Sequence, residues 1–385
     1  MQTVEAAGLP IGEGFPPRIM GIVNLSEESP YDPSVFTDPS AAAAYVDSVL
    51  IQAGADIVDV GLESANKRFD VLTAEEELER LDRAIAMISA VEGTAVFSIE
   101  TRYASVADAA LSAGFDMVND ICGFADPEMV EVCDRHEAVA VKMAGPGNLE
   151  APGALTTVDA IYDALASEPL PERTIIDPAF GGWCEGKTVD VDRETFQRLR
   201  EFRAINRPML VSINRKNFLR HLAERSTDDA LPVSLAATAL AVERGAHVIR
   251  THDVAATCDA AIIGHHFSAN RLRDPERSVY ELDINTPSDL RRHLERIDAG
   301  SAVAADLRAK AFELRSLTDV DRQLLRHLTT DRGGTFAEGT ASGPAILVVS
   351  PRDVDRLRDA VKGESHTLAE MLETIDALMN GDPRG

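Results

Sequence analysis

The stretch AVFSIETRYASVADAALSAGFDMVND (residues 95–120) contains a strand, a helix and a second strand in succession. Residues 95–99 and 116–120 are short, mostly apolar runs without strict alternation, which is typical of strands buried on both faces of a sheet. Residues 105–114 between them repeat apolar side chains at helical spacing and end at Gly114. The stretch therefore predicts a unit in which a helix connects two parallel strands.

The same unit recurs along the chain on both sides of this stretch. Eight short apolar runs are present, at residues 19–23, 56–60, 95–99, 116–120, 138–143, 174–178, 208–213 and 247–250. They stop at Asn24, Glu63, Glu100, Asn119 with Asp120, Lys142, Asp177, Asn214–Lys216, and Arg250 with His252. Helical periodicity lies between them, as at residues 74–91, 126–136, 193–202 and 231–245. Eight such units in roughly 250 residues predict an α/β fold, a TIM (β/α)8 barrel with its active site at the C-terminal strand ends.

An open, doubly wound parallel sheet is the alternative fold. Such a sheet usually carries a glycine-rich phosphate loop directly after its first strand. The residues at this place, NLSEESPYD (24–32), contain no glycine. The barrel is therefore the preferred prediction.

Three regions are expected along the chain. Residues 1–17 form an N-terminal leader segment, and residues 18–285 form the barrel. Residues 286–385 begin with charged amphipathic helices, continue with a loop at residues 331–343, and then have one apolar run at 345–349 before two further helices. This C-terminal appendage, a mostly helical α/β region, shows no catalytic constellation. It is expected to serve packing or oligomerisation.

The net charge of the chain limits its partners. The 64 acidic residues outnumber the 38 Lys and Arg residues, which gives a formal charge of −26. Such a surface repels nucleic-acid phosphate and anionic membranes, so neither is an expected partner. An anionic small molecule would need a local cluster of basic residues. The acidity also suits a protein that stays soluble in a salt-rich cytoplasm.

The cysteines and the first residues indicate the compartment. The four cysteines form no CxxC pair, and this predicts reduced thiols in a cytoplasmic protein. Residues 1–17 lack the basic and apolar regions of a signal peptide. No apolar run reaches the ~18 residues of a membrane span.

The residues at the strand ends divide into an acceptor-rich group and a basic group. The first group comprises Glu100, Asn119, Asp120 and Asp177. The second comprises Arg215, Lys216, Arg250 and His252. Acceptors suit a flat heterocycle with several N–H donors, and barrels often bind phosphate after their seventh and eighth strands. The pattern predicts a nitrogen-rich ring with a phosphate or diphosphate tail, and Asn24 is placed to bind a Mg²⁺ on that tail.

In these segments the chain resembles the dihydropteroate synthase family. The resemblance rests on MGIVNLSEES (20–29), DIVDVGLES (56–64), residues 97–124, IIDPAFG (175–181) with GKT (186–188), VSINRKNF (211–218) and VIRTHDV (248–254). It covers about residues 18–265. The family is a TIM barrel that joins hydroxymethyl-dihydropterin diphosphate to p-aminobenzoate in folate biosynthesis, with Mg²⁺. The resemblance thus implies a cytoplasmic transferase, with a homodimer as the usual assembly.

The resemblance also implies a role for each matching residue. Pterin-ring binding falls to Glu100, where the family has Asp, and to Asn119 and Asp177. Lys216 matches the lysine between the pterin and p-aminobenzoate sites. Diphosphate binding is implied for Arg250 and His252, which with Lys216 form the implied catalytic group. The Mg²⁺-linked asparagine of the family corresponds to Asn24.

Two loops depart from the family pattern. The first loop usually reads N-x-T-P-D-S-F-S-D-G, and here Ser26–Pro33 differs from it. The second loop usually reads G-G-E-S-T-R-P-G, and here Ala65 and Asn66 take the Thr and Arg positions. The departures fall mostly on the second-substrate side, whereas the pterin side is better kept.

Two other functions fit parts of the pattern. A pterin-dependent methyltransferase that serves a corrinoid partner would use the same pterin pocket, but it would not need the basic cluster of Lys216, Arg250 and His252. A non-catalytic pterin-binding subunit would explain the altered loops. Several residues also have purely structural interpretations, because Asn119 and Asp120 could tie a loop and His252 could be a packed histidine.

Overall fold

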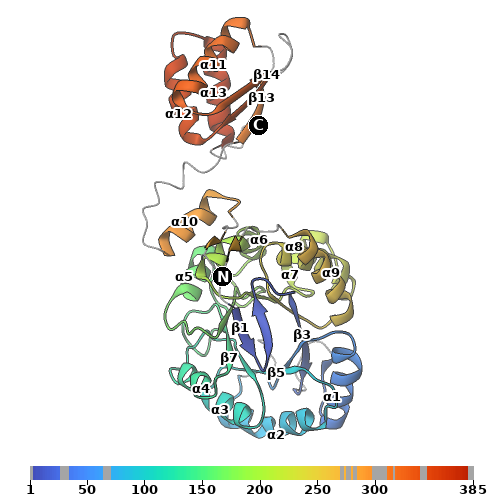
Figure 1. The fold of residues 1–385 in the computed structure, drawn as a ribbon. Helices are drawn as coiled ribbons and strands as arrows, with labels where there is room; N and C mark the ends of the chain where they lie inside the picture. Colours follow the sequence, from blue (N-terminus) through green and yellow to red (C-terminus); the bar gives the residue numbers. More distant parts are fainter. Residues whose placement is uncertain are drawn as a thin grey trace. The chain divides into compact units, whose positions relative to one another are not determined.

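The structure is a computed structural model that describes residues 3–26, 34–63, 71–268, 273–274, 279–280, 284–296, 310–314, 317–338 and 345–379. The chain divides into two compact units, Met1–Leu282 and Asp283–Gly385 (Figure 1). The sequence analysis placed the corresponding boundary at residue 285. The first unit is a barrel, and the second is a small sheet covered by helices.

Eight parallel strands form the barrel, in the order β8-β7-β6-β5-β4-β3-β10-β9. They are β3 (Arg18–Asn24), β4 (Ile57–Gly61), β5 (Val96–Thr101), β6 (Met117–Asp120), β7 (Val139–Met143), β8 (Thr174–Asp177), β9 (Leu210–Val211) and β10 (Val248–Thr251). A parallel bridge between Ile176 and Met209 joins β8 to the segment that leads into β9, which closes the ring. The predicted fold class is confirmed.

Helices surround the strands (Figure 1). They are α1 (Pro39–Tyr45), α2 (Ala74–Ala90), α3 (Ala104–Ser112), α4 (Met129–Arg135), α5 (Val158–Ala166), α6 (Val189–Gln197), α7 (Asn217–Ala223), α8 (Leu231–Glu243) and α9 (Val254–Phe267). Three short segments add other helical turns, namely a wider π-helix at Val46–Ile51 and tighter 3-10 helices at Leu199–Ile205 and Asp228–Ala230. The outer core forms where apolar faces of helices such as α2 and α3 meet strand residues that point outward.

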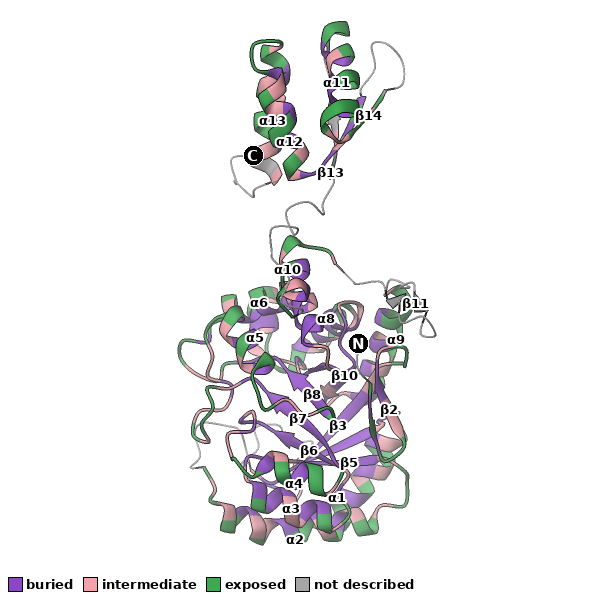
Figure 2. Ribbon diagram, turned by 60° about the vertical axis from the view of Figure 1, so that its left-hand side comes forward, coloured by how far each residue is buried: buried purple, intermediate pink, exposed green. Residues whose placement is uncertain are grey.

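Alternation along each strand decides which side chains enter the barrel. In β4, Ile57 packs in the interior cluster, whereas Val58 and Val60 pack against the helices. Asp59 between them shares the inward parity of Ile57, because successive side chains of a strand point to opposite faces. The strand ladders are nearly all buried (Figure 2). The direction of each side chain therefore decides which polar residues can meet at the C-terminal ends of the strands, which form the mouth of the barrel.

The N-terminal segment forms a hairpin that the sequence analysis did not predict. Strands β1 (Thr3–Ala6) and β2 (Leu9–Gly12) pair antiparallel. Val4, Ala6 and Ile11 are buried in the same cluster as interior residues of the barrel strands, including Met20 and Leu210. The hairpin thus covers the N-terminal end of the barrel, opposite to the C-terminal strand ends.

The second unit contains a three-stranded antiparallel sheet in the order β13-β15-β14. Its elements are α10 (Pro287–Arg296), β13 (Lys310–Leu314), α11 (Asp319–Arg332), β14 (Thr335–Glu338), β15 (Ala345–Val349), α12 (Pro351–Val361) and α13 (His366–Met379). Sequence analysis expected a loop at residues 331–343, yet residues 335–338 form β14. This strand is short and exists through its pairing with β15, which a local pattern does not reveal.

A short hairpin pairs β11 (Arg273–Asp274) with β12 (Val279–Tyr280). No helix in the described parts of the chain combines the length and the apolar content that crossing a membrane requires.

Candidate functional site

A network around Asp59 lies in the C-terminal mouth of the barrel. Asp59 is completely buried, and its carboxylate accepts hydrogen bonds from Ser98 Oγ at 2.7 Å and Asn119 Nδ2 at 3.0 Å. Arg250 Nε donates to Asp59 Oδ2 at 2.7 Å, and a terminal nitrogen of Arg250 donates to Glu100 Oε2 at 2.6 Å. Residues from four strands therefore meet at one carboxylate.

Register explains why these side chains meet. Asp59 lies beside Ser98, and Glu100 lies beside Asn119, in neighbouring parallel strands. Asp59, Asn119 and Arg250 all have the inward parity of their strands. The network places two carboxylates around one guanidinium, with Asn119 beside it.

Burial and charge oppose each other in this network. Burial by itself would lower the pKa of Arg250, but Glu100 and Asp59 together raise it above its ordinary value. Burial raises the pKa of Glu100, and the Arg250 guanidinium opposes that shift. Removing one partner would leave an uncompensated buried charge, which costs about 3–5 kcal/mol.

Asp177 and Lys216 form the adjoining part of the mouth. Asp177, at the end of β8, accepts a hydrogen bond from the backbone N–H of Ala179 at 2.8 Å, and burial raises its pKa. Lys216 lies directly before α7, with its ammonium 5.6 Å from the centre of the Trp183 ring. Burial, aided by Arg250, lowers the pKa of Lys216. A Cβ at Gly181 would lie 3.3 Å from Lys216 Nζ, so the loop passes close to this ammonium.

His252 and Asn24 are joined by Ser34 at the other side of the mouth. Ser34 Oγ lies 3.1 Å from His252 Nδ1, and Asn24 Nδ2 donates to the same oxygen at 3.3 Å. Burial, together with Arg250, lowers the pKa of His252 to about 3, so its imidazole is neutral at pH 7. A Cβ at Gly61 would lie 2.6 Å from Asn24 Oδ1, so glycine leaves room for this amide oxygen.

A magnesium ion fits this arrangement only as a partner of the substrate. The described residues contain no group of three or more His, Cys, Asp or Glu side chains that could hold a metal by themselves. Mg²⁺ often takes only one or two protein oxygens and obtains further ligands from substrate phosphates and water. Asn24 Oδ1 could supply one such oxygen.

Three of the strand-end residues face elsewhere. Lys142 has the outward parity, and its ammonium donates to the carbonyls of Ser167 at 2.6 Å and Pro169 at 3.1 Å. Asp120 accepts hydrogen bonds from the backbone N–H groups of Cys122 and Phe124, so it ties the loop after β6. Arg215 is held by Asp253 at 2.8 Å and by two backbone carbonyls.

Asp59 was missed by the sequence analysis, which considered only the residues where apolar runs stop. An acidic residue inside DIVDV was the available signal, since a charge in the middle of a buried strand needs partners. The altered loops give no further information, because residues 27–33 of the first loop and Ala65 and Asn66 of the second lie outside the described residues. Ser26, at the start of the first loop, is buried.

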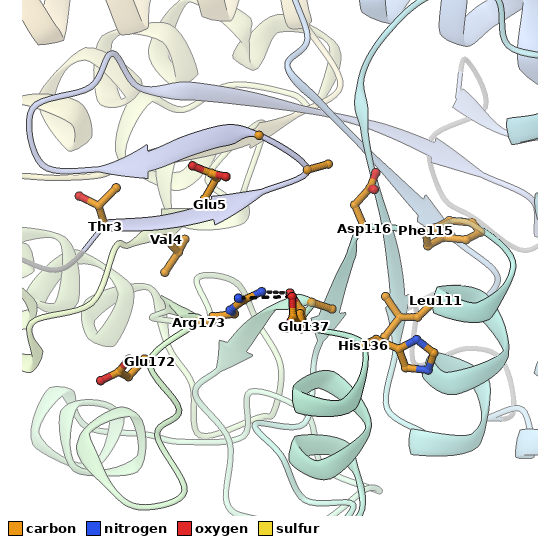
Figure 3. A pocket seen from close by; sticks show the side chains of 13 residues that line it. Thr3, Val4, Glu5, Leu111, Phe115, Asp116, His136, Glu137, Glu172 and Arg173 are labelled. Carbon is orange, nitrogen blue, oxygen red and sulfur yellow. Dashed lines mark hydrogen bonds and ion pairs between the residues drawn. The ribbon is translucent and has the colours of Figure 1, made fainter.

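A hollow at the N-terminal end of the barrel differs from this mouth. It measures about 600 Å³ and lies between the β1–β2 hairpin and the starts of strands, including Asp116, Glu137 and Arg173 (Figure 3). Arg173 pairs with the exposed Glu137, and His136 pairs with Asp108 outside the hollow. These charges are solvated, and the end is the one that barrels use for stability.

The fold is a TIM barrel whose C-terminal mouth gathers buried acceptor and cationic side chains. The pterin binding enzyme family model matches residues 20–252. A probable bifunctional folylpolyglutamate synthase/dihydropteroate synthase of Haloferax volcanii is 31% identical over 67% of this chain. The chain spans only 31% of that relative's length. The dihydropteroate synthase of Neisseria meningitidis serogroup C is 32% identical, over 63% of this chain and 90% of the relative.

A solved structure supports the same relationship. The dihydropteroate synthase of Coxiella burnetii in complex with pteroic acid is 28% identical, with a TM-score of 0.58 over 70% of this chain and 99% of that one. The chain belongs to the pterin binding enzyme family, among the dihydropteroate synthases. The predicted resemblance is confirmed.

Proposed function

We propose that this chain condenses 6-hydroxymethyl-7,8-dihydropterin diphosphate with p-aminobenzoate to give 7,8-dihydropteroate and diphosphate, in folate biosynthesis. The observation that carries the proposal is the buried ion network of Asp59, Glu100 and Arg250, with Lys216 and His252 beside it. It supplies acceptors for a pterin and cations for a diphosphate within one mouth.

The pterin would bind at the acceptor-rich side of the mouth. Asp177 and Glu100 would accept the ring's N–H donors, while the side-chain amide of Asn119 can both accept and donate. Asn119 is held by Asp59 at 3.0 Å, so its orientation is set before a ligand arrives. Preorganised groups of this kind lower the ordering cost of binding.

The diphosphate would bind at the basic side of the mouth. Arg250 and Lys216 would neutralise its charge, and the neutral His252 would contribute a hydrogen bond. Since the pKa of His252 is about 3 in the ligand-free protein, an anion bound beside it would favour the protonated form. Mg²⁺, held through Asn24 and the phosphates, would stabilise the charge of the leaving diphosphate.

The reaction needs positioning more than acid–base catalysis. The aniline nitrogen attacks the exocyclic methylene carbon of the pterin, and the bond between that carbon and the diphosphate oxygen breaks. Diphosphate leaves with the electron pair, and the aniline nitrogen releases one proton to solvent. Lys216, between the two parts of the mouth, would stabilise the charge that develops on the leaving oxygen.

Assembly as a homodimer in the cytoplasm is part of the proposal. Large apolar side chains on α7, α8 and α9 are exposed, namely Leu222, Leu240, Ile262, Ile263 and Phe267. These helices pack side by side, and exposed apolar side chains gathered on neighbouring helices are typical of protein interfaces. All four cysteines are free thiols, which fits a reducing compartment. Sedimentation equilibrium should give twice the chain mass, and a monomer at micromolar concentration would contradict the assembly.

The enzyme assay is direct. Purified protein in molar KCl, given both substrates and Mg²⁺, should form dihydropteroate detectable by mass spectrometry, and EDTA should stop it. No product, together with pterin binding seen by calorimetry, would favour the non-catalytic subunit. Methyl transfer from a methylated pterin to a corrinoid would favour the methyltransferase.

A further inference from the structure

Arg102, the residue after β5, connects three parts of the rim. Its side chain is only 3% exposed. One terminal nitrogen donates to Glu63 Oε2 at 2.9 Å, in the segment after β4. The other donates to the carbonyl of Leu149 at 2.7 Å, in the segment after β7. One guanidinium therefore links rim segments that are far apart in the sequence.

Arg102 and the adjacent Tyr103 also hold the two ends of the second loop. Glu63 Oε1 accepts a hydrogen bond from the backbone N–H of Leu72 at 3.1 Å. The hydroxyl of Tyr103 donates to the carbonyl of Leu72 at 2.6 Å. Glu63 and Leu72 stand on either side of residues 64–70, which lie outside the described residues. Arg102 and Tyr103 thus fix both described flanks of that loop.

The segment held at Leu149 continues to Trp183. A Cβ at Gly153 would lie 2.4 Å from Trp183 Cγ, so the indole packs directly on this glycine. The indole N–H donates to the carbonyl of Phe180 at 3.2 Å, and its ring lies 5.6 Å from Lys216 Nζ. Arg102 thus joins Glu63 to Leu149, and the chain that follows Leu149 reaches Gly153, which contacts Trp183 beside Lys216.

Arg102 is poorly suited to a purely stabilising role. Its Nε is buried and has no hydrogen-bond partner among the described residues. A buried ion pair often contributes little net stability, because desolvation offsets the attraction, and an unsatisfied buried donor is unfavourable. Both of its hydrogen bonds to described residues lead to rim segments.

We infer that Arg102 is a positioning residue for the second substrate. It holds Glu63 and the carbonyl of Leu149, whose segment continues to the glycine on which Trp183 packs. Trp183 lies beside Lys216, where the proposed function would place the aminobenzoate. This inference rests on the proposed function.

The kinetic test compares two buried arginines. Arg102→Met should raise the KM for p-aminobenzoate about tenfold or more, the loss expected for a charge-assisted hydrogen bond, and leave the KM for the pterin diphosphate within about twofold. Arg102→Lys should recover part of the loss. Arg203→Met is the control, because Arg203 is equally buried and pairs with Glu13 at 2.8 Å, far from the rim segments. Equal rises in both KM values, or none, would overturn the inference.

A second measurement does not require activity. Trp183 is the only tryptophan, so acrylamide quenching of its emission reports how tightly the rim segment covers it. Arg102→Met should raise the quenching constant and Arg203→Met should not. Tyr103→Phe, which removes only the hydrogen bond to Leu72, tests the same contacts with less risk to folding and should raise the aminobenzoate KM less than Arg102→Met. Unchanged quenching in Arg102→Met would contradict the inference, whereas absence of product in the unaltered protein would contradict only the proposed function.

Discussion

The two ends of the barrel hold charge in different ways. At the C-terminal mouth, Asp59 and Asn119 are buried and Arg250 bridges two carboxylates. At the N-terminal end, the exposed side chains of Glu137 and Arg173 pair at a hollow of about 600 Å³. The hollow offers volume, whereas the mouth contains buried charges whose desolvation is unfavourable for folding. Costly buried charge, rather than empty space, identifies the working end.

The largest expected effect is on kcat, and it compares two buried lysines at the C-terminal end of the barrel. Lys216→Met should lower kcat by about 100-fold or more, since it removes a cation aimed at the developing charge. Lys142→Met is its control, because Lys142 is also buried but points out of the barrel toward two carbonyls. Steady-state kinetics with saturating substrates measure the difference. Equal losses in both variants would contradict a specific role of Lys216, because Lys142 does not face the mouth.

The next effect tests the residue that sequence analysis missed. Asp59→Asn should lower kcat/KM for the pterin diphosphate by about 10- to 100-fold, because Arg250 loses one of its two carboxylate partners, which lies at 2.7 Å. Asp120→Asn should reduce the melting temperature instead, because Asp120 accepts only loop N–H groups. Equal losses of pterin affinity in both variants would contradict the account, which assigns the inward-pointing Asp59 to the site and the outward-pointing Asp120 to the loop.

Asn24 gives an effect on the metal requirement. Asn24→Ala should raise the Mg²⁺ concentration for half-maximal activity by about tenfold, as expected for loss of one ligand oxygen. Asn214→Ala is the matched change, since the Asn214 amide donates to Asp253 instead. A Mg²⁺ titration of activity distinguishes them, and an unchanged requirement in Asn24→Ala would remove Asn24 from the metal's ligands.

The smallest effect concerns stability at two adjacent glutamates. Burial raises the pKa of Glu77 to about 7, although Thr101 donates to it, so the folded state binds this proton more tightly than the unfolded state. Its stabilising contribution is therefore complete below pH 4.5 and is lost as the pH rises through 7. Glu77→Gln should remove this loss and raise the melting temperature at pH 8.

Glu76 should give the opposite dependence of stability on pH. Its pKa is lowered by hydrogen bonds from Thr73 in the capping box, so its contribution is present above pH 4.5 and fades as the pH falls below that value. Glu76→Gln should therefore reduce the melting temperature slightly at pH 7. Thermal unfolding from pH 4 to pH 8 compares the two variants, and parallel curves would refute the assigned directions.

Much of the fold could be predicted from the apolar runs, because parallel strands buried on both faces leave a clear local pattern. The β1–β2 hairpin and β14 could not, because each is short and depends on a partner that local sequence does not specify. The mouth was located through its strand-end residues. Asp59 was missed and Lys142 was grouped with the rim because strand parity, which separates them, needs the exact register.

Trp183 fluorescence offers the most direct test of the claim that the C-terminal mouth is the ligand site. Titrating pterin diphosphate should change the emission saturably at one ligand per chain. Arg250→Lys, which keeps the charge but loses the planar fork, should weaken that binding about tenfold or more. Arg173→Met, in the N-terminal hollow, should leave it unchanged. Binding that survives Arg250→Lys but fails in Arg173→Met would contradict the account.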